Sequence, residues 1–165
     1  MNLEAIVEGA AVLIDANLLI YAAEAISPQC RHLLNRCAAG ELTGFVSVVG
    51  LAEFCHRRMM QEAQSLGLAA SNPAKALGQD PTLVRRLSRY PQELEDMLAS
   101  ELTVLSIDIA DFPKALELQR QYGLLTNDSL HLAAGLREGL SFVATNDPHF
   151  DNVADITVFQ PDDLT

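Results

Sequence analysis

The sequence predicts an α/β fold, with a mainly parallel β-sheet that helices cover on both faces. Short, continuously apolar runs alternate along the chain with longer stretches whose apolar residues recur at helical spacing. Runs that are apolar throughout are typical of parallel strands, which are buried on both sides. The 165 residues are enough for one domain with a sizeable core, so we expect a single domain over residues 1–165.

Five segments have the character of short buried strands. The first, residues 11–14, is apolar and ends at Asp15, and the second, residues 43–49, is rich in Val and Phe. The other three are residues 102–107, 140–145 and 156–160.

Helical spacing marks four long segments between these strands, residues 28–39, 48–66, 109–122 and 127–138. Gly40, Gly123 and Gly139 follow three of them directly, as helix stops often do. Residues 69–100 contain several helix breakers, among them Pro73, Pro81 and Pro91. We therefore expect two or three short helices there, inserted between the second and third strands of the same domain.

Cysteine usage and hydropathy favour a cytoplasmic protein. Three cysteines form no Cys-x-x-Cys pair, which makes a disulfide framework improbable. The cluster Cys30, His32, Cys37, Cys55 and His56 has no standard zinc-ligand spacing, so a zinc site is set aside. Residues 1–10 do not resemble a signal peptide, and no apolar run approaches the ~18 residues that span a membrane.

Four acidic residues are expected at the carboxyl edge of the sheet, where open parallel sheets bind their ligands. Asp15 follows the first strand, and Glu53 lies about one and a half turns into the helix after the second. Asp147 follows the fourth strand, and Asp128 begins the helix that leads into it. That helix should run antiparallel to the strands, which places its start at the same edge.

Each acid alone has a structural explanation: a helix start for Asp15 and Asp128, a turn for Asp147, and solvent exposure for Glu53. Four carboxylates at one edge repel one another, however, and a cation normally neutralises such a cluster. Oxygen ligands suit Mg²⁺ or Mn²⁺, and carboxylate-held Mg²⁺ is typical of phosphodiester chemistry. The cluster therefore predicts a metal-dependent phosphodiester hydrolase.

Neighbouring polar residues are candidates for a supporting role. Asn17 and Thr145 each lie two residues from a candidate ligand and can orient a carboxylate or hold a metal-bound water, although hydrogen bonds within the turns explain them equally well. Asp151 is expected to be a solvated loop acid. His131 lies one turn after Asp128 and either reaches a phosphate or, as is commoner, satisfies a partner in the protein interior.

Four segments in this order resemble the motifs of PIN-domain ribonucleases, and among them the VapC-type toxins of type II toxin–antitoxin pairs. They are residues 12–21 (VLIDANLLIY), 47–54 (SVVGLAEF), 127–134 (NDSLHLAA) and 144–150 (ATNDPHF). The resemblance spans most of the chain. Ala16 departs from the pattern, because the family often has Thr or Ser there.

This resemblance implies a three-layer α/β/α sandwich, Mg²⁺- or Mn²⁺-dependent cleavage of single-stranded RNA regions, a homodimer, and inhibition by a cognate antitoxin. It also implies that Asp15, Glu53, Asp128 and Asp147 are the catalytic and metal-binding residues, supported by Asn17 and Thr145. The alternative is a non-catalytic binding subunit of the same fold that acts through an antitoxin or RNA partner. The presence of all four acids favours the enzyme.

The charge distribution suggests where RNA would bind. The net charge is −11, but residues 55–91 carry +4 and the rest of the chain −15. A uniformly basic nucleic-acid coat is thereby excluded. The candidate RNA-binding residues in the basic segment are Arg57, Arg58, Arg85, Arg86 and Arg89, with a solvated helical face as the other interpretation.

Overall fold

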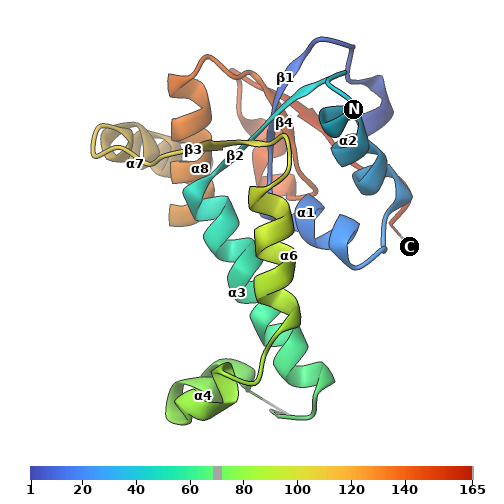
Figure 1. Cartoon of the computed structure of the whole chain (residues 1–165). Helices are drawn as coiled ribbons and strands as arrows, with labels where there is room; N and C mark the ends of the chain where they lie inside the picture. Colours follow the sequence, from blue (N-terminus) through green and yellow to red (C-terminus); the bar gives the residue numbers. More distant parts are fainter. Residues whose placement is uncertain (69–71, 165) are drawn as a thin grey trace.

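A five-stranded, all-parallel sheet forms the centre of the computed structural model, which describes residues 1–68 and 72–164 (Figure 1). The strand order is β3-β2-β1-β4-β5. The strands are β1 (Ala11–Ile14), β2 (Thr43–Ser47), β3 (Thr103–Leu105), β4 (Phe142–Ala144) and β5 (Thr157–Phe159). The predicted fold class is confirmed, and all five strands lie within the predicted segments.

The helices connect successive strands, and the elements are η1 (Leu3–Ala5), α1 (Ala16–Ala23), α2 (Pro28–Ala38), α3 (Val48–Ser65), α4 (Pro73–Gln79), α5 (Pro81–Val84), α6 (Arg89–Leu98), α7 (Asp111–Tyr122), α8 (Thr126–Arg137) and η2 (Pro148–Asn152). The glycines predicted as helix stops have positive φ angles, 74° at Gly40 and 75° at both Gly123 and Gly139.

Helix α1 was not predicted. Most of its side chains are buried, so its sequence has no polar face to distinguish it from the preceding strand.

Two apolar cores lie on opposite faces of the sheet and make the predicted three layers. Val12 and Ile14 of β1 face the core formed with α1, α2 and α3, whereas Leu13 faces the core formed with α7 and α8. Helix α8 lies close against β1 because Gly135 has no side chain. A Cβ atom there would lie 2.6 Å from Cδ2 of Leu13.

A helical arm extends away from the sheet. We use this name for the last two turns of α3 with α4, α5 and the start of α6, which returns beside α3 (Figure 1). A small apolar cluster around Ala63, Leu77 and Leu87 holds the arm together. The predicted helical insertion over residues 69–100 thus corresponds to α4, α5 and α6, while its first residues, 69–71, lie outside the described part of the chain.

Buried charges fix the arm to the body. The guanidinium of Arg58, 4% exposed, donates at 2.7 Å to both carboxylate oxygens of Glu93 on α6 and at 2.7 Å to Glu24 at the end of α1. Three helices are therefore joined at one arginine.

Glu62 of α3 caps the start of α6 from the side. Its carboxylate accepts the backbone N–H groups of Ser88, Arg89 and Tyr90, each at 2.9 Å. Burial alone would raise the pKa of Glu62, but these hydrogen bonds outweigh it and lower the pKa.

Within residues 1–68 and 72–164, no helix has the length and apolarity that a membrane span requires.

We predict that Glu62→Gln lowers the free energy of unfolding by about 2 kcal/mol, because a neutral amide is a weaker acceptor than the buried carboxylate for the three N–H donors at the start of α6. Urea denaturation at pH 7 measures the change. Because the fold lowers the pKa of Glu62 from its ordinary 4.5, the ionised carboxylate stabilises the protein above pH 4.5. The difference in unfolding free energy between wild type and variant should therefore shrink as the pH falls through the folded-state pKa. The matched control is Glu95→Gln on the exposed face of α6. An equal loss in both variants would contradict the capping role.

Candidate metal and active site

Three of the four predicted acids line one open groove of about 900 Å³ at the carboxyl edge of the sheet: Glu53 from α3, Asp128 from α8 and Asp147 from the segment after β4. The fourth, Asp15, follows β1 and is close enough for its charge to raise the pKa of both Glu53 and Asp128. β1 and β4 are adjacent, and the connections from them run to opposite sides of the sheet. This reversal of strand order is where open α/β sheets bind ligands.

Asp15 is held by a network of polar side chains. Its Oδ2 accepts the Thr145 hydroxyl at 2.6 Å and the Asn17 amide at 2.7 Å. Burial raises the pKa of Asp15, the hydrogen bond from Thr145 opposes that rise, and the charge of Asp147 adds to it. The network therefore orients a carboxyl group whose ionised form is disfavoured by burial and by the charge of Asp147.

Thr145 joins the two strand ends, because its fully buried hydroxyl also accepts the backbone N–H of Asp147 at 2.9 Å. The Asn17 amide oxygen accepts the N–H of Asn146 at 3.3 Å, a second link between the same segments. Asn17 and Thr145 thus both donate to the carboxylate of Asp15, whereas Thr145 contacts Asp147 at its backbone N–H, a hydrogen bond within the turn.

Glu53 faces the groove beside a basic residue. Arg57, one helical turn further along α3, lies 3.9 Å from the Glu53 carboxylate and is largely exposed. Burial raises the pKa of Glu53, as does the charge of Asp15, and Arg57 opposes both. Arg57 thus compensates part of the negative charge at the edge of the groove.

The pKa of Asp128 is raised well above that of an ordinary aspartate. Burial first, and then the charges of Asp15, Asp147 and Glu53, raise it to about 6. Mutual repulsion of this kind marks a cluster that gains from a bound cation.

The donor set fits a hydrated Mg²⁺ or Mn²⁺, because it consists of carboxylates with amide and hydroxyl groups beside them. Within the described residues, no three acidic, histidine or cysteine side chains already lie at the spacing of a shared ion. Mg²⁺ commonly keeps several waters and binds one or two carboxylates directly, so some of these acids can act through bound water.

The structure places three other predicted residues away from the groove or in different contacts. His131 is 3% exposed, and burial lowers its pKa to about 4, so it is a neutral interior histidine and does not reach a phosphate. Asp151 is exposed and accepts the side-chain amide of Gln160 at 3.0 Å. Arg58 is buried in its ion pairs with Glu24 and Glu93, so its inclusion among the RNA-binding candidates is withdrawn.

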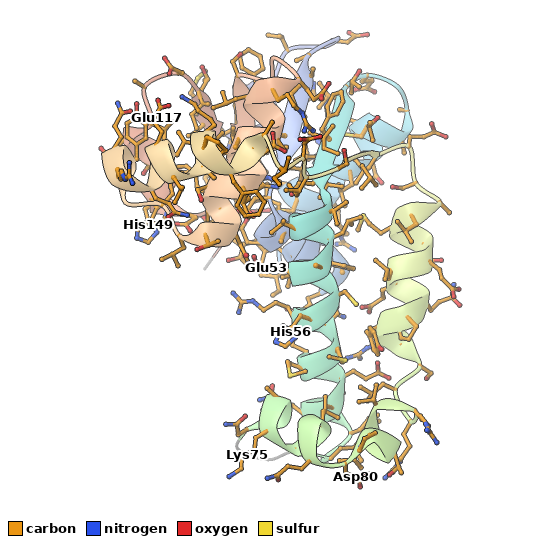
Figure 2. All side chains as sticks on the ribbon, turned by 90° about the vertical axis from the view of Figure 1, so that its left-hand side faces the viewer. Glu53, His56, Lys75, Asp80, Glu117 and His149 are labelled. Carbon is orange, nitrogen blue, oxygen red and sulfur yellow. The ribbon has the colours of Figure 1, made fainter. Side chains whose placement is uncertain are left out.

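Of the remaining basic candidates, Arg57 lies at the groove, and Arg85, Arg86 and Arg89 lie on the arm. Figure 2 places Lys75 and Asp80, which precede these three in sequence, at the far end of α3 from Glu53. Arg85 and Arg86 follow α5 with no side-chain ion pair among the described residues, whereas Arg89 lies 3.7 Å from Glu93. From Glu53 to the end of α3 the helix rises about 18 Å, so these arginines lie well outside the acidic groove.

Two histidines at the site were not predicted. His56 lines the groove one turn after Glu53, and the helical spacing of three residues was the signal that could have found it. His149 donates its backbone N–H at 2.9 Å to Oδ1 of Asp147, and its Nδ1 lies 2.7 Å from the same oxygen. Its position two residues after an aspartate is typical of an Asx turn. Figure 2 shows both histidines, His56 on α3 and His149 beyond α8.

We predict that the carboxyl group of Asp128 destabilises the metal-free protein more at pH 7.5 than at pH 5.5. Its pKa is raised to about 6 in the fold, so the folded protein still holds a proton at pH 5.5 that the unfolded chain has lost, and this contribution to stability falls as the pH rises through 6. Asp128→Asn should therefore raise the melting temperature more at pH 7.5 than at pH 5.5, whereas the opposite contribution of His131, whose pKa burial lowers to about 4, is present in both proteins. Asp151→Asn is the control, and an unchanged pH dependence in Asp128→Asn would remove Asp128 from the cluster.

Comparison with solved structures identifies the same fold in proteins of low sequence identity. A chain of VapBC2 from Rickettsia felis, bound to a DNA fragment from its promoter, has a TM-score of 0.59 at 18% identity, with 91% of this chain and 98% of that chain covered. A chain of DNA-bound VapBC from Salmonella typhimurium has a TM-score of 0.59 at 15% identity and coverage of 94% and 98%.

VapC20 from Mycobacterium tuberculosis, described as a Sarcin-Ricin loop cleaving toxin, has a TM-score of 0.57 at 10% identity, with 88% of this chain and 96% of that chain covered. A search of curated proteins finds no match in sequence. The PIN domain family model matches residues 12–156, a range that contains all four acids and, apart from Ala11, every strand but the last. The chain therefore belongs to the PIN domain family.

Proposed function

We propose that this protein is a metal-dependent endoribonuclease that hydrolyses phosphodiester bonds in RNA. The observation that carries the proposal is the set of four carboxylates at the point where the strand order of a PIN-domain sheet reverses: three line one open groove, and the charge of the fourth, Asp15, acts on two of them. The description of the structurally similar VapC20 as a loop-cleaving toxin supports RNA as the substrate.

Asp15, Glu53, Asp128 and Asp147 would hold Mg²⁺ or Mn²⁺. A bound ion would lower the pKa of water, which makes hydroxide available as the nucleophile, and would supply positive charge to the phosphate. Asn17 and Thr145 orient Asp15, and the backbone N–H and Nδ1 of His149 engage one oxygen of Asp147. The chain thus supplies a fixed set of oxygen donors at one edge of the sheet.

We further propose that the protein is the toxin of a toxin–antitoxin pair, acting in the cytoplasm under the control of a cognate antitoxin. The similar folds in VapBC complexes support an antitoxin partner. A homodimer is supported by large apolar side chains exposed at and before α7, namely Ile109, Phe112 and Leu116. Phe112 and Leu116 lie four residues apart in α7 and so share one side of the helix, and Ile109 lies two residues before its start.

The second candidate is a non-catalytic subunit that uses the same groove only to bind RNA or an antitoxin. The unneutralised carboxylates weigh against it, because a groove that merely bound a polyanion would be expected to carry basic residues instead. Incubation of the pure protein with total RNA, with and without Mg²⁺ or Mn²⁺, separates the two.

We predict that Asp15→Asn and Asp147→Asn each abolish Mn²⁺-dependent RNA cleavage, since each removes a negative ligand with almost no change in volume. Glu53→Gln should behave in the same way. Gel-resolved cleavage of total RNA measures the loss, and circular dichroism verifies that each variant is folded. Asp151→Asn is the matched control and should retain most of the activity, because its carboxylate pairs with Gln160. Full activity in both Asp15→Asn and Asp147→Asn would sink the nuclease assignment.

The exposed arginines of the helical arm are proposed to bind RNA phosphates. Replacing Arg85, Arg86 and Arg89 by Gln should weaken RNA binding and reduce the slope of log affinity against log salt by about 0.7 for every phosphate that is no longer neutralised. Binding is measured with catalytically inactive Asp15→Asn as background.

The control for this prediction is Arg31→Gln combined with Arg120→Gln, two arginines outside the arm. If the arm variant keeps the wild-type slope, its arginines are a solvated face and RNA binds elsewhere.

A further inference from the structure

A buried polar junction joins the start of α3 to the middle of α8. Ser47, fully buried at the end of β2, accepts the backbone N–H of Gly50 at 3.1 Å and so caps α3. The same hydroxyl oxygen lies 2.8 Å from Nδ1 of His131. One side chain therefore both starts α3 and contacts the helix that carries Asp128.

The hydrogen bonds of this junction assign the proton positions. Burial lowers the pKa of His131 to about 4, so its imidazole is neutral at pH 7. If Ser47 donates to Nδ1, only the Nε2–H of His131 lacks a partner within the described residues. If Nδ1 of His131 donates to Ser47 instead, both the hydroxyl proton of Ser47 and the Nε2 atom of His131 lack a hydrogen-bond partner within the described residues. The first arrangement satisfies more groups, so Nδ1 is the acceptor.

An unpaired buried N–H costs stability that an apolar side chain would avoid. The Nδ1 acceptor is therefore the property that distinguishes His131 from a leucine of similar size at this position.

Gly50 makes the close contact between the two helices possible. A Cβ atom at Gly50 would lie 3.3 Å from Nδ1 of His131 and 3.2 Å from Cγ2 of Val46, closer than side chains normally pack. The imidazole thus rests directly on the first turn of α3. The spacing of α3 and α8 is set here by a hydrogen bond and by backbone contact.

Both acids contributed by helices lie one turn from this junction. Glu53 comes three residues after Gly50, and Asp128 comes three residues before His131. We propose that His131 is a positioning residue: through Ser47 it holds α3 against α8 at the separation that lets Glu53 and Asp128 serve one divalent ion. This inference rests on the proposed metal-dependent function.

The test compares two replacements of His131. Asn keeps an acceptor near the position of Nδ1, whereas Leu keeps the volume and removes the acceptor. Calorimetric titration with Mn²⁺ at pH 7.5 should give an affinity within about threefold of wild type for His131→Asn and about tenfold or more weaker for His131→Leu, the range for residues that orient metal ligands. RNA cleavage should fall in the same order.

Ser47→Ala removes the other half of the hydrogen bond, and it provides the test if His131→Leu does not fold. It should weaken Mn²⁺ binding as His131→Leu does, and the double variant should be no weaker than the worse single one, because both break the same bond. Leu33→Val in α2 is the control for a general loss of stability and should leave the Mn²⁺ affinity unchanged. Wild-type affinity in folded His131→Leu or Ser47→Ala would overturn the inference.

Failure of the proposed function gives a different result, namely a wild-type protein that binds no Mn²⁺. The inference is then decided by crystal structures of His131→Leu and His131→Asn. A wider separation of the Glu53 and Asp128 carboxyl groups in the Leu variant alone supports it, and an unchanged separation overturns it.

Discussion

Repulsion between Asp15 and Asp147, at the ends of two adjacent parallel strands, is the constraint around which the rest of the site is arranged. The strand pairing fixes both residues at the same edge whether or not their charges are compensated. Within the chain the compensation comes from Thr145, whose hydroxyl donates to Asp15 and accepts the N–H of Asp147. Like charges held close together lower the stability of the fold, and such a loss of stability is typical of a functional site.

The sequence was sufficient to place the acids at one edge of the sheet, because Asp15 and Asp147 follow strands, Asp128 lies in the first turn of α8 and Glu53 lies in the second turn of α3. It was not sufficient to find α1, whose buried residues continue the apolar run of β1 with no polar face. It also misjudged Arg58, which sits in a helix of mixed charge that is typical of an exposed face. The partners that bury it, Glu24 and Glu93, lie 34 and 35 residues away in sequence, and only the tertiary fold brings them together.

The division of charge along the chain bears on the proposed metal site. Outside residues 55–91 the chain has a net charge of −15, which repels a polyanion, and the exposed arginines of the arm lie about 18 Å along α3 from Glu53. Exposed charges are largely screened beyond about 8 Å at physiological ionic strength. The arm therefore cannot neutralise the groove, and the proposed metal ion would supply positive charge among the carboxylates themselves.

The arm can present its arginines at a fixed place only if its own direction is fixed. Its apolar cluster is small, so the direction depends on the bonds of Arg58 to Glu24 and Glu93 and on the cap that Glu62 provides to α6. Buried ion pairs contribute little net stability, but loss of one partner leaves an uncompensated charge, which strongly disfavours other arrangements. These interactions therefore fix the direction of the arm more than they add to the free energy of folding. The buried charges of the arm and the Ser47–His131 junction thus act alike, since each holds α3 at one position relative to a neighbouring helix.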